Sequence, residues 1–249
     1  TDQLLKKYQL TIWESLRPDT LIWLSIEKDH KREIIPLSTA PSITKVLTNT
    51  SKKRGIKLIL PFADLQDREK LSSSDLWGNY SQTIKAASIR YNSQAILAVR
   101  IHQDPSGLWL SKWSLYVLDK VKNWNAKNED LSLLLSQGIH ILADKLAHLF
   151  ALSSDTLNKN NSIIQVNNVT NFNGFLKTID YFKHISAIQS SHLIKVKGDS
   201  LIFKIYYFGD EKHLSQILSL GDVLQKVENS DLPQTQLEQN KPSEYVSVI

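Results

Sequence analysis

The chain has 249 residues, of which 41% are hydrophobic and 22% are charged, and its formal net charge is +5. This composition is typical of a folded globular protein with one large domain or two ordinary ones. The absence of cysteine excludes disulfides, zinc–thiolate sites and thiol catalysis. No run approaches the roughly 18–20 apolar residues that a membrane-crossing helix needs.

The first half of the chain predicts strands and helices alternating around one mixed sheet, an α/β fold. Alternating or continuous apolar runs predict strands at 21–26, 34–35, 57–62, 95–102 and 108–117. Apolar residues at helical spacing predict helices at 38–54, 75–91 and 131–152. The turn sequence Asp104-Pro105-Ser106-Gly107 predicts a hairpin between the last two strands. Residues 120–130, which include Trp124, are expected to form a polar connection.

The second half predicts a smaller α+β domain. Residues 153–162 are rich in Ser and Asn and form the expected linker, so we place the first domain at 1–152. Residues 163–228 have the strand and helix order β-α-β-β-α-β, which predicts a ferredoxin-like domain. Residues 229–249 form a polar tail, and its last five residues, 245–249, predict a strand that pairs within the second domain or with another subunit.

No catalytic motif is present among the phosphate-binding glycine loops, nucleophile elbows and metal-binding helices that we considered. Three carboxylates, Asp64, Asp67 and Glu69, follow the expected strand at 57–62, where ligands of α/β sheets often bind. They could hold a divalent cation in an enzyme, although the neighbouring Arg68 and Lys70 could equally neutralise them as ion pairs. We therefore expect no catalytic residue, no metal and no cofactor, and keep the cation-dependent enzyme as an alternative.

Aromatic residues are the best candidates for contact with a partner. Trp77, Trp109, Trp113, Trp124 and Tyr245 are either core residues or part of a protein-binding surface. Aromatic residues beside lysines also bind single-stranded nucleic acid, which we keep as a second alternative. Lys and Arg are scattered along the chain instead of clustered, so we expect no nucleic-acid partner.

Three segments together resemble a family of bacterial envelope proteins that is known only as a domain of unknown function. They are 58–80, 86–101 and 107–116, and they contain the run 64–68 and the Asp75-Leu76-Trp77-Gly78 motif. The strand at 21–26 also fits, and the resemblance extends roughly from Trp13 to Val227. The first domain is in addition similar to the amino-terminal domain of TolB and to the periplasmic part of the curli-export lipoprotein.

These resemblances imply a periplasmic protein associated with the outer membrane, which binds other envelope proteins in a multi-subunit assembly such as a secretion system. They imply a structural, non-enzymatic role and no catalytic residue. The chain begins with Thr1 instead of methionine, so we expect the gene to encode a signal peptide or a lipid anchor before it. Contact with the membrane is expected only indirectly or through such an anchor.

Overall fold

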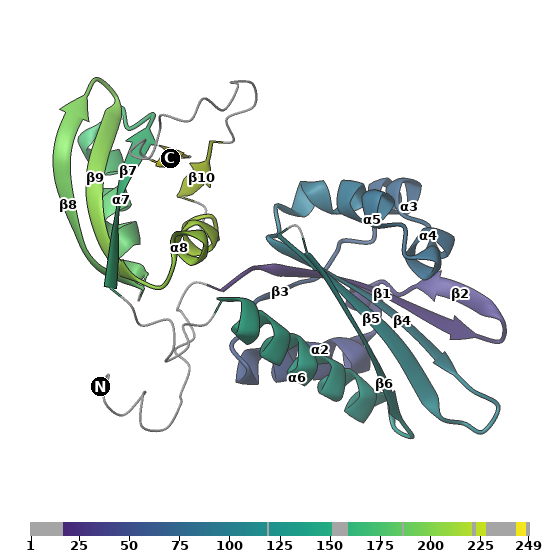
Figure 1. Cartoon of the computed structure of the whole chain (residues 1–249). Helices are drawn as coiled ribbons and strands as arrows, with labels where there is room; N and C mark the ends of the chain where they lie inside the picture. Colours follow the sequence, from purple (N-terminus) through teal and green to yellow (C-terminus); the bar gives the residue numbers. More distant parts are fainter. Residues whose placement is uncertain are drawn as a thin grey trace, which may run out of the picture. The chain divides into compact units, whose positions relative to one another are not determined.

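The computed structural model describes residues 17–118, 120–150, 159–185, 187–220, 223–227 and 243–247 (Figure 1). They form two compact units, one spanning Pro18–His148 and the other containing the described residues from Leu149 onward. Residues 1–16, residues 153–158 of the expected linker and most of the polar tail lie outside the described residues. The remainder of that linker is folded, because a strand begins at Lys159.

The first unit is built on one six-stranded mixed sheet with the order β2-β1-β4-β5-β6, and β3 pairs with β1 beside β2. Its strands are β1 (Thr20–Lys28), β2 (Lys31–Ile34), β3 (Leu58–Ile59), β4 (Ala95–Gln103), β5 (Trp109–Val117) and β6 (Lys120–Asn128). β1 runs parallel to β3 and β4, whereas β5 runs antiparallel to both of its neighbours, β4 and β6. The expected hairpin at Asp104–Gly107 is thus confirmed.

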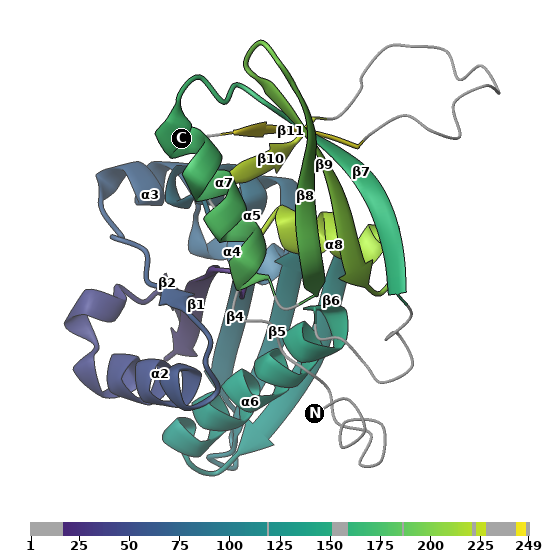
Figure 2. The same cartoon turned by 90° about the vertical axis from the view of Figure 1, so that its left-hand side faces the viewer.

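Helices cover both faces of this sheet (Figures 1 and 2). One face carries α2 (Pro41–Lys53) and α6 (Leu131–Phe150), preceded by the short helix η1 (Leu37–Thr39). The other face carries α3 (Leu65–Lys70), α4 (Ser73–Gly78), α5 (Ser81–Ser88) and the short helix η2 (Ile89–Tyr91). Leu21, Trp23 and Ala98 of the sheet pack there with Leu76 and Ile84 of the helices in one buried cluster.

Two of the expected elements in this unit are wrong in extent. The strand expected at 57–62 shrinks to β3, because Pro61 has no N–H to continue the ladder. The single helix expected at 75–91 is broken at Asn79, which adopts a left-handed backbone with φ of 55°. Tyr80 does not belong to the buried stripe that its spacing predicts, since its side chain is 59% exposed.

The polar connection expected at 120–130 is also wrong, because most of it forms β6. This strand lies at the edge of the sheet and pairs with β5 over nine residue pairs, from Trp109–Asn128 to Val117–Lys120. Its side chains are mostly exposed, so its sequence lacks the apolar alternation by which strands are usually recognised. Lysine on an edge strand discourages pairing with another chain.

The second unit is a five-stranded mixed sheet with two helices. Its elements are β7 (Lys159–Asn167), α7 (Phe172–His184), β8 (Ile188–Lys197), β9 (Ser200–Phe208), α8 (Glu211–Leu218), β10 (Leu224–Lys226) and β11 (Ser243–Ser247). The strand order is β10-β11-β7-β9-β8. Tyr181, Phe182 and Ile217 of the helices share one core with Phe203 and Ile205 of β9.

The expected terminal strand is present and pairs within the second unit, where it begins at Ser243 and lies in the interior of the sheet. β11 lies between β10 and β7, antiparallel to the first and parallel to the second. It therefore separates β10 from β7, which would be neighbours in a ferredoxin-like sheet with the order β-α-β-β-α-β. At the level of class, the structure is a mixed α/β protein with two mixed sheets, and among its described helices none is both long and apolar enough to cross a membrane.

Candidate functional site

Two segments that lie far apart in the sequence meet at one corner of the first unit. One segment is the loop after β3, which leads into α3. Asp64 caps this helix, since its side chain accepts a hydrogen bond from the Asp67 amide at 3.0 Å. The other segment is η2 at the end of α5, which supplies Arg90 and Tyr91.

Arg90 joins the two segments. Its Nη1 and Nη2 donate to Asp64 Oδ1 and Oδ2 at 2.8 and 3.0 Å, and Nη1 also reaches Asp67 Oδ1 at 3.1 Å. The second oxygen of Asp67 accepts hydrogen bonds from the Ala63 amide at 2.8 Å and from the Tyr91 hydroxyl at 2.5 Å. Tyr91 in turn accepts a hydrogen bond from the Phe62 amide at 3.0 Å. The loop is therefore held by a closed polar network.

The network changes the acidity of its members. The hydrogen bonds from Arg90 lower the pKa of the Asp64 carboxyl and raise the pKa of Arg90 itself. Burial, together with the hydrogen bond to Asp67, raises the pKa of Tyr91 to about 12. Asp64 is therefore ionised, Arg90 positively charged and Tyr91 neutral at neutral pH.

The carboxylates at this corner do not form the cation site that we kept as an alternative. Asp64 and Asp67 direct their oxygens to Arg90, Tyr91 and backbone amides, while Glu69 is exposed on α3. Within the described residues, no group of three histidine, aspartate or glutamate side chains is arranged to hold a metal ion. The ion pairs are made by Arg90, not by the adjacent Arg68 and Lys70 that the sequence offered.

Large apolar side chains project from both segments beside this network. Phe62 is 70% exposed, Leu65 is 73% exposed and Ile89 is 77% exposed. The Phe62 ring packs on the Tyr91 ring with 5.7 Å between the centroids, and the Arg90 guanidinium lies 5.3 Å from the Phe62 centroid. We call Phe62, Leu65 and Ile89 the apolar corner.

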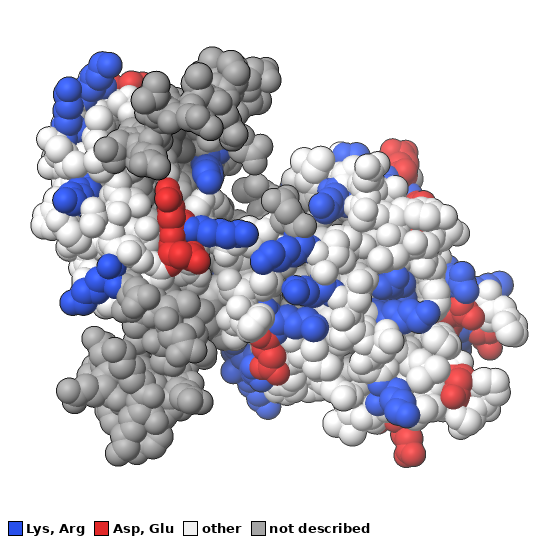
Figure 3. Space-filling model, in the orientation of Figure 1, with Lys and Arg blue, Asp and Glu red and all other residues white. Residues whose placement is uncertain are grey.

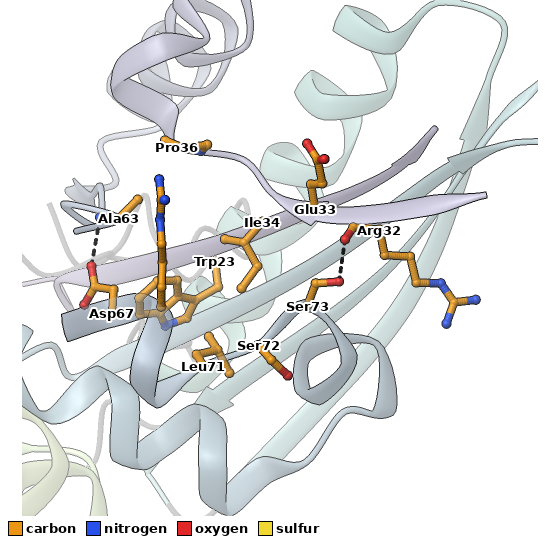
Figure 4. A pocket seen from close by; sticks show the side chains of 11 residues that line it. Trp23, Arg32, Glu33, Ile34, Pro36, Ala63, Asp67, Leu71, Ser72 and Ser73 are labelled. Atoms are coloured by element: carbon orange, nitrogen blue, oxygen red, sulfur yellow. Dashed lines mark hydrogen bonds between the residues drawn. The ribbon is translucent and has the colours of Figure 1, made fainter. Parts of the chain in front are cut away.

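A hollow of about 400 Å³ adjoins the apolar corner through Ala63 and Asp67 (Figure 4). β3 and β2 pair with the same edge of β1, but with different parts of it, and neither pairs with Trp23. The hollow lies at this gap between the two strands. Its walls combine the apolar side chains of Trp23, Ile34, Pro36, Ala63 and Leu71 with polar and charged ones. The polar and charged lining residues are Arg32, Glu33, Asp67, Arg68, Ser72 and Ser73. The Ser73 hydroxyl donates to the Arg32 carbonyl at 2.7 Å, and the Arg32 side chain points away from the hollow.

The structure divides the aromatic candidates for partner contact into buried residues and half-buried ones. Trp113 and Tyr245 are 0% and 1% exposed, so both are core residues and are not on a surface. Trp124 is half-buried and stacks on Trp113 with the ring planes at 12°. Trp77 donates to Ser25 Oγ at 2.8 Å, with Arg32 4.3 Å above its ring, and Trp109 is half-buried at the start of β5.

Sequence reasoning missed the residues that make the apolar corner. Phe62 falls at the end of the strand expected at 57–62, Leu65 follows that strand, and Ile89 falls within the helix expected at 75–91, while the sequence assigns no role to Arg90. The charge pattern gives one signal for Arg90. Asp64 and Asp67 lie three residues apart at the start of a helix, so both could pair with the same basic side chain. Nothing in the sequence identifies a residue 26 positions away as that cation.

Comparison with known proteins does not assign the chain to a family. No family model matches it, and no curated protein matches it. Among solved structures, it is similar to a ribosomal subunit interface protein from Coxiella burnetii, with 12% sequence identity and a TM-score of 0.27. That similarity covers 51% of this chain and 94% of the other, and a likeness of this size carries no functional conclusion.

Proposed function

We propose that the protein is a non-enzymatic, protein-binding subunit of the bacterial cell envelope, located in the periplasm and associated with an outer-membrane assembly such as a secretion system. The observation that carries the binding role is the apolar corner, where Phe62, Leu65 and Ile89 are each at least 70% exposed. The location rests on the resemblance of the first unit to envelope proteins and to the amino-terminal domain of TolB.

The way these side chains are held supports a contact surface. An exposed apolar side chain on a loose loop would lose conformational freedom on binding, which costs about 0.5–1.5 kcal/mol for each immobilised side chain. Here the flanking residues Asp64 and Arg90 are already fixed to each other, and Phe62 packs on Tyr91. The Phe62 ring is thus preorganised, and the backbone segments that carry Leu65 and Ile89 are fixed to each other through Asp64 and Arg90.

The surroundings define the partner's chemistry. Arg68 lies on α3 three residues after Leu65 and lines the adjacent hollow, where it makes no ion pair with any described residue. A matching protein segment would therefore place apolar side chains on the apolar corner and an acidic or carbonyl oxygen near Arg68. Arginine beside an exposed apolar cluster is typical of binding hot spots.

The binding role is tested with Phe62→Ser and Leu65→Ser, using Leu133→Ser as a matched control because Leu133 is also exposed, at 59%, but lies on α6. The chain is cross-linked in intact native cells, and the captured proteins are compared between variants. We expect both corner variants to lose a partner that the wild type and the Leu133 variant retain. Equal capture by all four chains would contradict the proposal.

The location is tested separately by fractionating cells that express the full-length gene. We expect the protein in the periplasmic or outer-membrane fraction, and its recovery with cytosolic markers would contradict the envelope assignment. The cross-linking comparison does not depend on this result, since the apolar corner would still identify a partner in another compartment.

A further inference from the structure

The second unit exposes apolar side chains along one edge of its sheet. β8 is the last strand in the order β10-β11-β7-β9-β8, so among the described strands none pairs with its outer edge (Figure 1). Leu193 and Val196, near the end of β8, are 41% and 57% exposed, and Phe172 and Leu176 of α7 are 70% and 46% exposed. We call these four residues the edge patch. An open strand edge beside exposed apolar side chains is a template for pairing with another chain.

Leu193 and Val196 project from the face of the sheet that the helices cover. Leu193 pairs with Phe203 of β9, which is buried beneath α7 with its ring centroid 5.2 Å from that of Phe182. Val196 pairs with Leu201, which belongs to the same core. Residues paired directly across strands share a face, so the exposed side chains of β8 continue the apolar core of this unit to the sheet edge.

On α7, the exposed apolar side chains lie on the flank away from α8. Tyr181 marks the α8 flank, because its hydroxyl donates to the Leu218 carbonyl at 2.9 Å. At about 3.6 residues per turn, Phe172 lies on the opposite side of the helix from Tyr181, and Leu176 lies one turn after Phe172. α7 packs against β8, and its first turns lie at the same end of the unit as the β8–β9 turn (Figure 2). The helix and the strand therefore contribute to one apolar surface.

The other face of the same strand end is cationic. Lys195 and Lys197 are exposed, and their β9 partners are residues that alternate with the buried ones. A shift in register at Ile194 creates this division. Leu193 and Val196 are three residues apart and would face opposite sides of a regular strand, but the extra residue of the bulge leaves both on the helix-covered face.

The charge around the edge patch is positive. β8 contains Lys195 and Lys197 and no acidic residue, and the nearest carboxylate along the chain belongs to Asp199 in the following turn. On the exposed part of α7, Asp180 and Lys183 offset each other. In Figure 3, Lys and Arg atoms stand at the tip of the β8–β9 hairpin with little acidic surface beside them.

We propose that the outer edge of β8 binds an extended segment of a partner protein, in which apolar residues alternate with acidic ones. An added strand gains affinity from main-chain hydrogen bonds and specificity from its alternate side chains. Its apolar side chains lie against the edge patch on the helix-covered face, and its carboxylates lie beside Lys195 and Lys197 on the other face. This surface shares no residue with the apolar corner, so it is independent of the proposed function.

A second copy of β8 is a poorer occupant of this edge. Antiparallel pairing of two copies about a two-fold axis places Lys195 and Lys197 of both copies on the same face of the joined sheet. Like charges on neighbouring strands are destabilising, whereas an acidic strand gives opposite-charge pairs at the same positions. The lysines therefore discriminate between possible partners as well as attracting one of them.

The test measures binding of a fluorescent peptide to the whole chain by anisotropy. The peptide has about eight residues, an ordinary strand length, with valine and glutamate in alternation. One comparison peptide has lysine in place of glutamate. The other has proline at two adjacent central positions, so that at least one lost N–H faces β8. The protein variants are Val196→Ser and Lys195→Glu, and their matched controls are Val121→Ser and Lys122→Glu on the exposed edge strand β6.

We expect the valine–glutamate peptide to bind the wild type and both β6 variants alike, and to bind each β8 variant about tenfold more weakly. No measurable binding, or an equal loss in the β6 variants, would overturn the site. Equal binding of the valine–lysine peptide would overturn the acidic partner, and undiminished binding of the proline peptide would overturn strand addition. Light scattering that shows a dimer dependent on Val196 would assign the edge to a second copy and overturn the proposal.

Discussion

Arg90 and Asp64, which lie 26 residues apart in the sequence, form a bidentate ion pair with hydrogen bonds of 2.8 and 3.0 Å. The same guanidinium reaches the buried Asp67, which is 2% exposed. This pair connects the loop after β3 to the end of α5, and it sets the positions of the apolar side chains on both sides. Loss of this ion pair should therefore affect both the stability of the first unit and the position of Phe62.

The first prediction concerns Asp67. Asp67→Asn removes the charge that Arg90 faces and replaces one acceptor oxygen by a donor that cannot serve the Ala63 amide and the Tyr91 hydroxyl. We expect the free energy of unfolding to fall by about 2 kcal/mol, as for loss of hydrogen bonds to a buried charged group. Denaturant unfolding measures this.

Asp144→Asn is the control for that measurement. Asp144 also pairs with an arginine, Arg54, but its side chain is 69% exposed, so the change should cost less than about 1 kcal/mol. If both substitutions cost the same, the polar network does not stabilise the loop as described.

The second prediction concerns alkaline pH. Tyr91 has a folded-state pKa raised to about 12, whereas an unfolded tyrosine titrates near about 10. The folded state then binds more protons between these values, so the stabilising contribution is complete below about pH 10 and is lost as pH rises toward about 12. Tyr91→Phe should show a shallower decrease in melting temperature over this range. Parallel curves for the two proteins would show that Tyr91 does not contribute.

The third prediction concerns helix α6. A Cβ atom at Gly138 would lie 2.0 Å from the Trp113 ring, which is fully buried and stacked on Trp124. Alanine normally favours a helix by about 1 kcal/mol over glycine, but overpacking a rigid core costs about 1–3 kcal/mol or more. We expect Gly138→Ala to lower the melting temperature, although the change improves helix propensity.

Gln137→Ala is the comparison, because residue 137 is exposed one position earlier on the same helix. It should leave the melting temperature nearly unchanged. Stabilisation by Gly138→Ala would mean that Trp113 has room to move, and the packing described here would be wrong.

The fourth prediction concerns the terminal strand. Tyr245 is 1% exposed in the core of the second unit, so Tyr245→Ala should cost about 3–5 kcal/mol, as other large buried aromatic residues do. Val246→Ala, on the opposite side of the same strand, should cost less, because that side chain is only half-buried. Thermal unfolding of the whole chain tests both. Equal, small effects would show that β11 is not an integral strand.

Local patterns in the sequence were sufficient for much of the architecture. The hairpin between β4 and β5 followed from its turn residues, and α2, α6 and α7 followed from the spacing of their apolar residues, because these signals act within a few residues. The terminal strand also followed from composition. The edge strand β6 did not, since an exposed strand has no apolar alternation to reveal it.

The sequence by itself determined the class of the protein, a mixed α/β chain without cysteine and without a recognisable catalytic motif. Only the tertiary structure decided which residues form sites. Arg90 meets Asp64 because helix packing joins two segments that lie 26 residues apart along the chain. The insertion of β11 between β10 and β7 was likewise decided by the fold, since a strand's composition gives its pairing tendency but not its neighbours.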